Sequence, residues 1–123
     1  MKVLERTKIA VAYDGSPRNN TGFRDMRQVK VFELDDDGIS ELEVRKLPEP
    51  SDFCEVDDGR CPGRNEGYLN AVADVLSDCK FLLLKEIGGY PSRVFLRRGI
   101  ETLEQEGEIE SLLQRIHKYL KVK

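Results

Sequence analysis

Histidine is scarce in this chain. Among 123 residues there is one, His117, and it falls within an amphipathic pattern near the carboxyl end. A nucleophile needs a neighbouring base, and this sequence offers no histidine pair or cluster that could supply one. The carboxylates are spread over turns and solvated faces. We therefore expect that the protein is not an enzyme.

An excess of positive charge is also missing. The chain has 20 Lys and Arg against 23 Asp and Glu, a net charge of −3 and a pI near 5.3. Long-range attraction to nucleic acid or to anionic membranes therefore has no support, and neither partner is expected. No apolar run approaches the ~20 residues needed to cross a bilayer, and residues 1–8 lack a signal-peptide core. We expect a cytoplasmic protein.

The length suits one domain with a single core, which we place at about residues 8–120 of a domain spanning 1–123. The residues 81–84, Phe-Leu-Leu-Leu, are all apolar, which is typical of a strand covered on both faces. Gly88 and Gly89 then allow a sharp turn, and Pro91 suits the start of a helix that Gly99 ends. Open α/β sheets bind ligands beyond the carboxyl ends of such strands, so a site is expected near Gly88.

The remaining elements follow from periodicity. Residues 8–13 predict the first central strand, and two alternating runs flank Asp36-Asp37-Gly38, which predicts a hairpin. Apolar residues at helical spacing predict two helices and a short run predicts an edge strand; these three segments are 66–76, 109–120 and 101–103. We expect an α/β domain with a mixed five-stranded sheet and helices packed on it. The hairpin should lie on one side of the first strand and the Phe81 strand on the other.

A long connection, residues 48–64, separates the two halves. It is rich in Pro, Gly and acidic residues and contains Cys54 and Cys61. A connection of this length without periodicity is usually functional or disordered. Three cysteines without secretory features favour thiols or metal ligands over disulfides, and thiolates are natural ligands of iron-sulfur units. Cys79, beside the apolar strand, is predicted to be a core residue.

Three segments carry a family resemblance. They are Lys-Ile-Ala-Val-Ala from Lys8, Leu-Ser-Asp-Cys-Lys-Phe-Leu-Leu-Leu-Lys-Glu-Ile-Gly at 76–88, and Arg-Arg-Gly-Ile at 97–100. With the final amphipathic helix, this succession resembles the dinitrogenase iron-molybdenum cofactor biosynthesis family, the small domains related to NifX and to the carboxyl-terminal part of NifB. The resemblance implies a ribonuclease H-like α/β fold. It also implies a carrier that binds an iron-sulfur or iron-molybdenum type cofactor transiently and meets metallocluster assembly or acceptor proteins.

The resemblance also implies site residues. Many members carry His-Phe-Gly-Arg before the second strand, whereas Gly22-Phe23-Arg24-Asp25 stands there in this chain, so the histidine position is Gly22. By this resemblance Phe23 and Arg24 line the cofactor site, and Cys54 and Cys61 are the metal ligands. From the residues alone, Arg27 could pair with an anion, and Gly88 and Gly89 could cradle one through helix N–H groups.

Other interpretations stay open. The glycines could form a purely structural turn, and the arginines could be ordinary solvated residues. Cys54 and Cys61 could be a reversible dithiol in a redox-regulated interaction module. A metal-dependent nuclease of the ribonuclease H type would need Asp14, Glu66 and Glu86 gathered around metal ions, and the chain lacks a basic surface for a nucleic acid.

Overall fold

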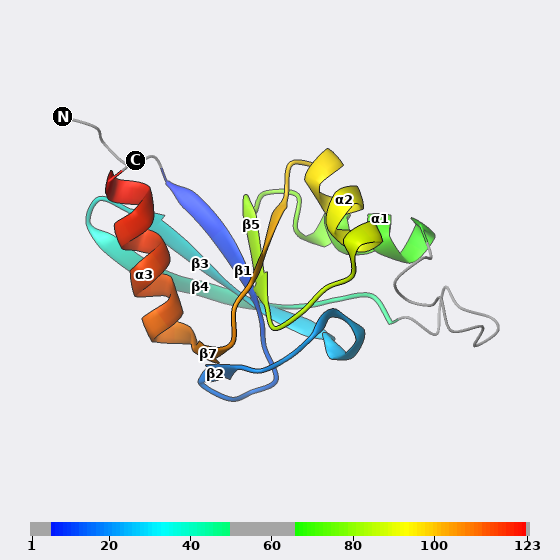
Figure 1. Cartoon of the computed structure of the whole chain (residues 1–123), viewed down its shortest axis with the longest axis horizontal. Helices are drawn as coiled ribbons and strands as arrows, with labels where there is room; N and C mark the ends of the chain where they lie inside the picture. The colour runs from blue at the N-terminus through cyan, green and yellow to red at the C-terminus, as the bar shows by residue number, and fades with distance from the viewer. Residues whose placement is uncertain (1–5, 50–65, 123) are drawn as a thin grey trace.

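The computed structural model describes residues 6–49 and 66–122. Five strands form one mixed sheet with the order β4-β3-β1-β5-β6 (Figure 1). They are β1 (Thr7–Ala12), β3 (Gln28–Asp35), β4 (Gly38–Lys46), β5 (Phe81–Leu84) and β6 (Glu101–Glu104). β3 pairs antiparallel with both β1 and β4, while β1, β5 and β6 pair in parallel. The predicted sheet is thus confirmed, with the hairpin on one side of β1 and β5 in the interior on the other.

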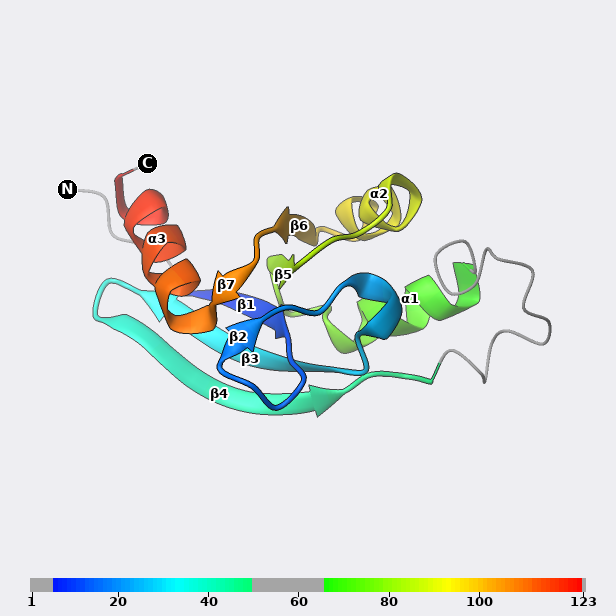
Figure 2. The same cartoon turned by 60° about the horizontal axis from the view of Figure 1, so that its bottom comes forward.

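Helices cover both faces of this sheet (Figures 1 and 2). α1 (Glu66–Val75) and α2 (Gly89–Arg97) pack on one face, and α3 (Ile109–Val122) packs on the other. Alternate strand residues feed the two cores, because successive side chains of a strand point to opposite faces. Ala10 and Leu82 belong to the core under α1 and α2, whereas Ile9 and Leu83 belong to the core under α3. No helix in the described part of the chain is long and apolar enough to span a membrane.

The β3–β4 hairpin turns as its Asp-Gly sequence predicts. The Asp35 carboxylate accepts hydrogen bonds from the backbone N–H groups of Asp37 (2.9 Å) and Gly38 (3.2 Å), and Gly38 has a φ of +138° that favours glycine. The strand register then shifts, with Val31 opposite Glu43 and Phe32 opposite Glu41. This bulge leaves Leu42 without an opposite residue, and it is 43% exposed. β4 stands at one end of the strand order and is therefore an edge strand of the main sheet.

The helix after β5 begins two residues earlier than Pro91, at Gly89, with Gly88 as its N-cap. Proline is still tolerated, because the first-turn N–H groups of a helix have no intrahelical acceptor. The helix ends as predicted at Gly99, whose φ is +82°. The N–H of Gly99 bonds the carbonyl of Leu96 and the N–H of Ile100 bonds that of Phe95, which is the Schellman arrangement.

A second, two-stranded sheet was not expected from the sequence. It pairs β2 (Arg18–Asn19) with β7 (Gly107–Glu108). A short 3₁₀ helix, η1 (Phe23–Asp25), follows β2 and leads into β3. The small sheet ties the loop after β1 to the start of α3, since the N–H of Ile109 also bonds the carbonyl of Pro17 at 3.0 Å.

Candidate functional site

The candidate site lies at the carboxyl ends of β1 and β5, where the loop before η1 meets the turn before α2. Two backbone hydrogen bonds join these segments, from the N–H of Phe23 to the carbonyl of Glu86 and from the N–H of Lys85 to the carbonyl of Thr21, both 2.9 Å long. The parallel pairing of β1 and β5 brings both loops to the same edge of the sheet. The structure thus brings together the Gly22–Arg27 segment and the Gly88 turn.

Phe23 stands at this junction with its side chain turned inward. It is 3% exposed, and its ring centroid lies 6.1 Å from that of Tyr68 and 5.8 Å from that of Phe95. Such aromatic contacts stabilise a core beyond simple burial. The Phe23 ring therefore anchors η1 on α1 and α2.

Gly22 and Glu86 face each other across the junction. Gly22 has φ −84°, a conformation that any residue adopts, so the backbone does not require glycine there. A Cβ at this position would lie 3.0 Å from Cγ of Glu86. The Glu86 side chain thus occupies the space that a side chain at position 22 would enter.

The two predicted arginines differ in their roles. The Arg27 guanidinium donates to the carbonyls of Arg24 (2.9 Å) and Met26 (3.1 Å) and lies 4.0 Å from the Glu49 carboxylate. Arg27 therefore holds the backbone at the end of η1 in place through these contacts. It also lines a cavity of about 340 Å³ shared with Asp14 and Gln28. The Arg24 side chain is exposed at the surface.

The amino end of α2 is the most favourable place for an anion in this site. Among the described residues no side chain caps it, and its own first turn has no acidic residue, so its N–H groups are available to an anion. Two carboxylates lie nearby, because Glu104 accepts the N–H of Ile87 at 3.4 Å and Glu66 accepts the hydroxyl of Tyr90. Gly88 and Gly89 are exposed. Nη1 of Arg93 lies 3.3 Å from the point where a Cβ on Gly89 would stand, which adds a second positive group.

Arg93 was missed by the sequence reasoning. Helical side chains lean toward the amino end of their helix, so a residue four positions along reaches the first turn. Once Gly89 is known as the first helical residue, the spacing from 89 to 93 predicts this contact. Placing the helix start at Pro91 concealed it.

The predicted metal ligands Cys54 and Cys61 lie outside the described residues. Cys79 is confirmed as a core residue, being 3% exposed. Burial, with the neighbouring Asp78 carboxylate as a further cause, raises the pKa of its thiol to about 11. Cys79 is therefore a poor nucleophile and a poor metal ligand at neutral pH.

The carboxylates of the nuclease alternative serve other contacts. Asp14 accepts the N–H of Ser16 at 2.9 Å in a local turn, and Glu66 accepts the hydroxyl of Tyr90 at 2.6 Å. Within residues 6–49 and 66–122, no three His, Cys, Asp or Glu side chains are grouped so that they could hold a metal ion. His117 lies on the other face of the sheet, where its Nε2 is 2.6 Å from the carbonyl oxygen of Asp35.

The family model described as dinitrogenase iron-molybdenum cofactor matches residues 5–119 of the chain, which is nearly its whole length. The protein belongs to this family. The match includes the Gly22–Arg27 segment, the residues 54 and 61, and the Gly88 turn. Among curated proteins, none matches the chain in sequence.

Two solved structures share the fold of this family member. PH0822 superposes with a TM-score of 0.67 at 15% identity, with 92% of each chain covered. MJ0327, a proposed dinitrogenase of Methanocaldococcus jannaschii, superposes with a TM-score of 0.50 at 13% identity, covering 95% of this chain and 90% of the other. At such low identity both comparisons concern the fold alone.

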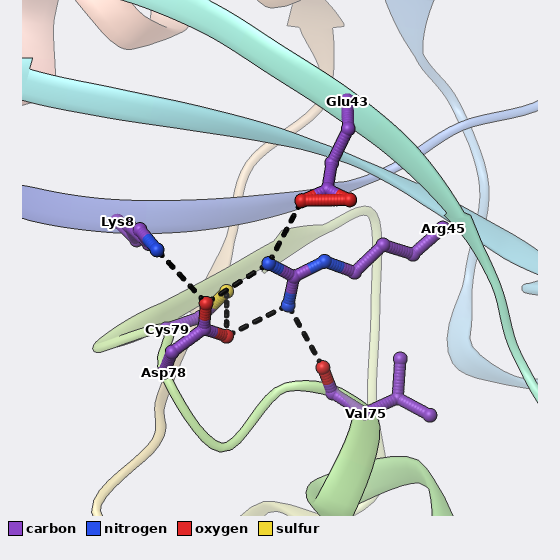
Figure 3. Close-up of polar contacts among 6 residues, drawn as sticks. All are labelled: Lys8, Glu43, Arg45, Val75, Asp78 and Cys79. Carbon is purple, nitrogen blue, oxygen red and sulfur yellow. Dashed lines mark hydrogen bonds and ion pairs between the residues drawn. The ribbon is translucent and has the colours of Figure 1, made fainter.

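The Asp-Cys pair that carried much of the family resemblance has a structural role (Figure 3). Asp78 accepts hydrogen bonds from both terminal nitrogens of Arg45, at 2.7 and 2.9 Å, and from Nζ of Lys8 at 3.0 Å. Arg45 also donates to the carbonyl of Val75 at 2.9 Å. The Arg45 hydrogen bonds, with that of Lys8, hold the pKa of Asp78 well below its usual range. Asp78 therefore fastens β4, through Arg45, and β1, through Lys8, to the turn that precedes β5.

Proposed function

We propose that this protein is a small accessory protein that carries an iron-sulfur or iron-molybdenum type cofactor, or a precursor, during the biosynthesis of a nitrogenase-type metallocluster. The observation that carries this proposal is the family match over residues 5–119. The protein binds and releases its cargo without chemical turnover. It works in the cytoplasm with metallocluster assembly or acceptor proteins as partners and needs no nucleic acid.

We also propose that the fold is of the ribonuclease H type. Its five-stranded order, β4-β3-β1-β5-β6, places the first strand at the centre, and only the second strand of the main sheet, β3, runs against the others. This topology places the loops after β1 and β5 side by side. It supports a ligand site at the carboxyl edge of the sheet.

The charges of the site favour an anionic cargo held at the α2 side. The N–H groups of the first helical turn and the Arg93 guanidinium attract negative charge. The Glu86 carboxylate, beside Gly22 and two residues before Gly88, repels negative charge from the Gly22 side of the same turn. Cys54 and Cys61 remain the proposed thiolate ligands. Because Gly22 offers no side-chain ligand, the cargo is held loosely. Loose binding suits a carrier that must release its cargo to a partner.

Anaerobic reconstitution tests this proposal. The wild type should take up a cluster or isolated cofactor. Ultraviolet-visible and electron paramagnetic resonance spectra of the reconstituted protein measure this uptake. Cys54→Ala and Cys61→Ala should lose or alter the spectrum, and Arg93→Ala should weaken uptake about tenfold, as the loss of one charge-assisted contact predicts. Arg115→Ala, an exposed change on α3, is the matched control.

The outcomes separate the parts of the proposal. If the wild type takes up nothing, the carrier function is wrong for this protein. Unchanged uptake in both cysteine variants would contradict thiolate ligation and leave the α2 end as the site. A reversible Cys54–Cys61 disulfide without any cluster uptake would favour the redox-regulated interaction module.

A further inference from the structure

The outward face of α2 carries a stripe of two arginines and one leucine. Arg93, Leu96 and Arg97 are spaced by three and four positions, so they share one side of the helix. All three are exposed, while Pro91, Val94 and Phe95 on the opposite side are buried. α2 is packed against α1 and β6, and Figure 2 shows it at the outside of its layer. The stripe therefore faces solvent.

Leu96 is unusually exposed for a large apolar side chain. At 61% it is the most exposed of the large apolar side chains in the described part of the chain. Its neighbours Arg93 and Arg97 form no ion pair or side-chain hydrogen bond with any residue the structure describes. Arg98 differs, because it ties α2 to α1 through Asn70 (2.9 Å) and Asp74 (2.5 Å).

The local charge is opposite to that of the whole chain. Residues 87–100 contain three arginines and no Asp or Glu, although the chain has 23 acidic residues and a net charge of −3. Arg98 pairs with Asp74 of α1, which leaves Arg93 and Arg97 as the charges on the outer side of α2. The helix is thus locally cationic on an acidic protein, and the exposed Glu86 and Glu101 flank it in sequence.

We infer that the Arg93–Leu96–Arg97 stripe is a docking surface for a partner protein whose complementary surface has an apolar depression flanked by carboxylates. Arg is enriched at protein interfaces, where it pairs with carboxylates in two-point contacts. A nucleic acid would satisfy the arginines through its phosphates but would leave Leu96 in water. The exposed leucine beside two arginines that have no partner among the described residues therefore favours a protein.

The stripe begins beside the proposed cargo site, since Arg93 reaches the amino end of α2. A partner seated on Leu96 and Arg97 would stand next to the cargo, where transfer requires it. The inference rests on the proposed function only in taking this partner to be a donor or acceptor of the cargo. The surface itself is argued from exposure and charge.

A defined probe tests the surface on the cargo-free protein. A short synthetic peptide of alternating glutamate and leucine should bind ¹⁵N-labelled protein and shift the amide resonances of α2, and the same peptide with lysine for glutamate should not. Binding should weaken with added salt, because charges at a surface are screened. Arg97→Glu should weaken it about tenfold and Leu96→Ser about fivefold, as for central contacts of an interface.

Matched variants elsewhere control for charge and hydrophobicity. Arg115→Glu on α3 and Leu42→Ser on β4 make the same changes at exposed positions and should leave peptide binding unchanged. Thermal unfolding checks that each variant is folded. If Arg97→Glu is not folded, Arg97→Gln replaces it in the binding measurement. Neither Leu96→Ser nor Arg97→Glu should alter cluster uptake, so failure of docking and failure of the carrier function are distinguishable.

Three results would overturn the inference. They are resonance shifts outside α2, equal losses in the α2 and control variants, and preferential binding of an oligothymidylate or of phosphatidylserine vesicles at the same stripe. The last result would assign the stripe to a nucleic acid or to a lipid surface instead of a protein.

Discussion

Arg45 and Asp78 form a two-point ion pair across 33 positions of sequence, with Nη1–Oδ1 and Nη2–Oδ2 distances of 2.7 and 2.9 Å. Lys8 reaches the same carboxylate from β1 at 3.0 Å. The exposed edge strand β4, the central strand β1 and the turn before β5 are therefore held by one aspartate (Figure 3). A planar guanidinium suits this geometry better than an ammonium group would.

This pairing predicts a loss of stability in acid. It lowers the pKa of Asp78 in the folded state below the ordinary value of 3.8, so its contribution is fully present above that value and is lost as the pH falls toward the folded pKa. Because the Asp78 side chain is 41% exposed, solvent screening reduces the contribution to on the order of 1 kcal/mol. Urea unfolding at pH 7 and pH 3 should therefore show a loss of stability that is smaller in Asp78→Asn than in wild type, by part of this contribution.

The control for the acid prediction is Asp74→Asn. The Asp74 side chain is 71% exposed and pairs with Arg98 at the surface, so its loss should change stability little at either pH. An Asp78→Asn protein with the same pH dependence as wild type would contradict the assignment to Asp78.

Burial predicts that Cys79 is chemically inert in the folded protein. With its pKa raised to about 11, roughly one molecule in ten thousand carries the thiolate at pH 7. In a Cys54→Ser/Cys61→Ser variant, Cys79 is the only thiol, and Ellman's reagent should titrate it in denaturant but only very slowly without it. Rapid reaction under native conditions would show that the α1–β5 junction opens.

Much of the fold could be predicted because its elements have clear periodicities. The unbroken apolar run of β5 indicated a strand with two covered faces, and each of its residues is buried. The buried stripe of α1 contains Leu69, Val72 and Ala73 at helical spacing. β2 and β7 have two residues each, which is too short for any periodic pattern to be recognised.

The site was predicted less completely than the fold. The rule that ligand sites lie beyond the carboxyl ends of parallel strands placed the loop after β1 beside the Gly88 turn, as the structure confirms. The inward turn of Phe23 could not be predicted, because its aromatic neighbours Tyr68 and Phe95 come from distant segments. The position of Arg93 required the true start of α2, which sequence rules fix only to within a few residues.

The aromatic contacts of Phe23 predict a stability effect that separates its core role from a cofactor role. Phe23→Ala should lower the free energy of unfolding by about 3–4 kcal/mol, and Phe23→Leu by about 1 kcal/mol. Urea titrations measure both. Phe23→Leu should stay folded and take up cofactor as wild type does; defective uptake in this folded variant would mean that the ring itself contacts the cargo.

The contact between Gly22 and Glu86 predicts coupled effects on stability. Gly22→Ala places a Cβ 3.0 Å from Cγ of the exposed Glu86 side chain, which must shift by a few tenths of an ångström, so the change should cost up to about 1 kcal/mol. In a Glu86→Ala background that atom is absent, so the same change should cost nothing or stabilise slightly by restricting the unfolded chain. A double-mutant cycle from urea unfolding should give a destabilising coupling of up to about 1 kcal/mol, and no coupling would show that the Glu86 side chain moves away freely.

The same pair predicts how cargo retention can be changed. The Glu86→Ala background lacks the nearest repelling carboxylate and leaves space beside Gly22. In this background, Gly22→His places an imidazole, a potential ligand, at the junction of the two loops. Reconstituted protein should therefore lose its cluster more slowly to a chelator than Glu86→Ala alone does, with Gly22→Ala/Glu86→Ala as the control for side-chain size. Equal rates of loss in the histidine and alanine variants would place the cargo away from Gly22, toward the α2 end of the site.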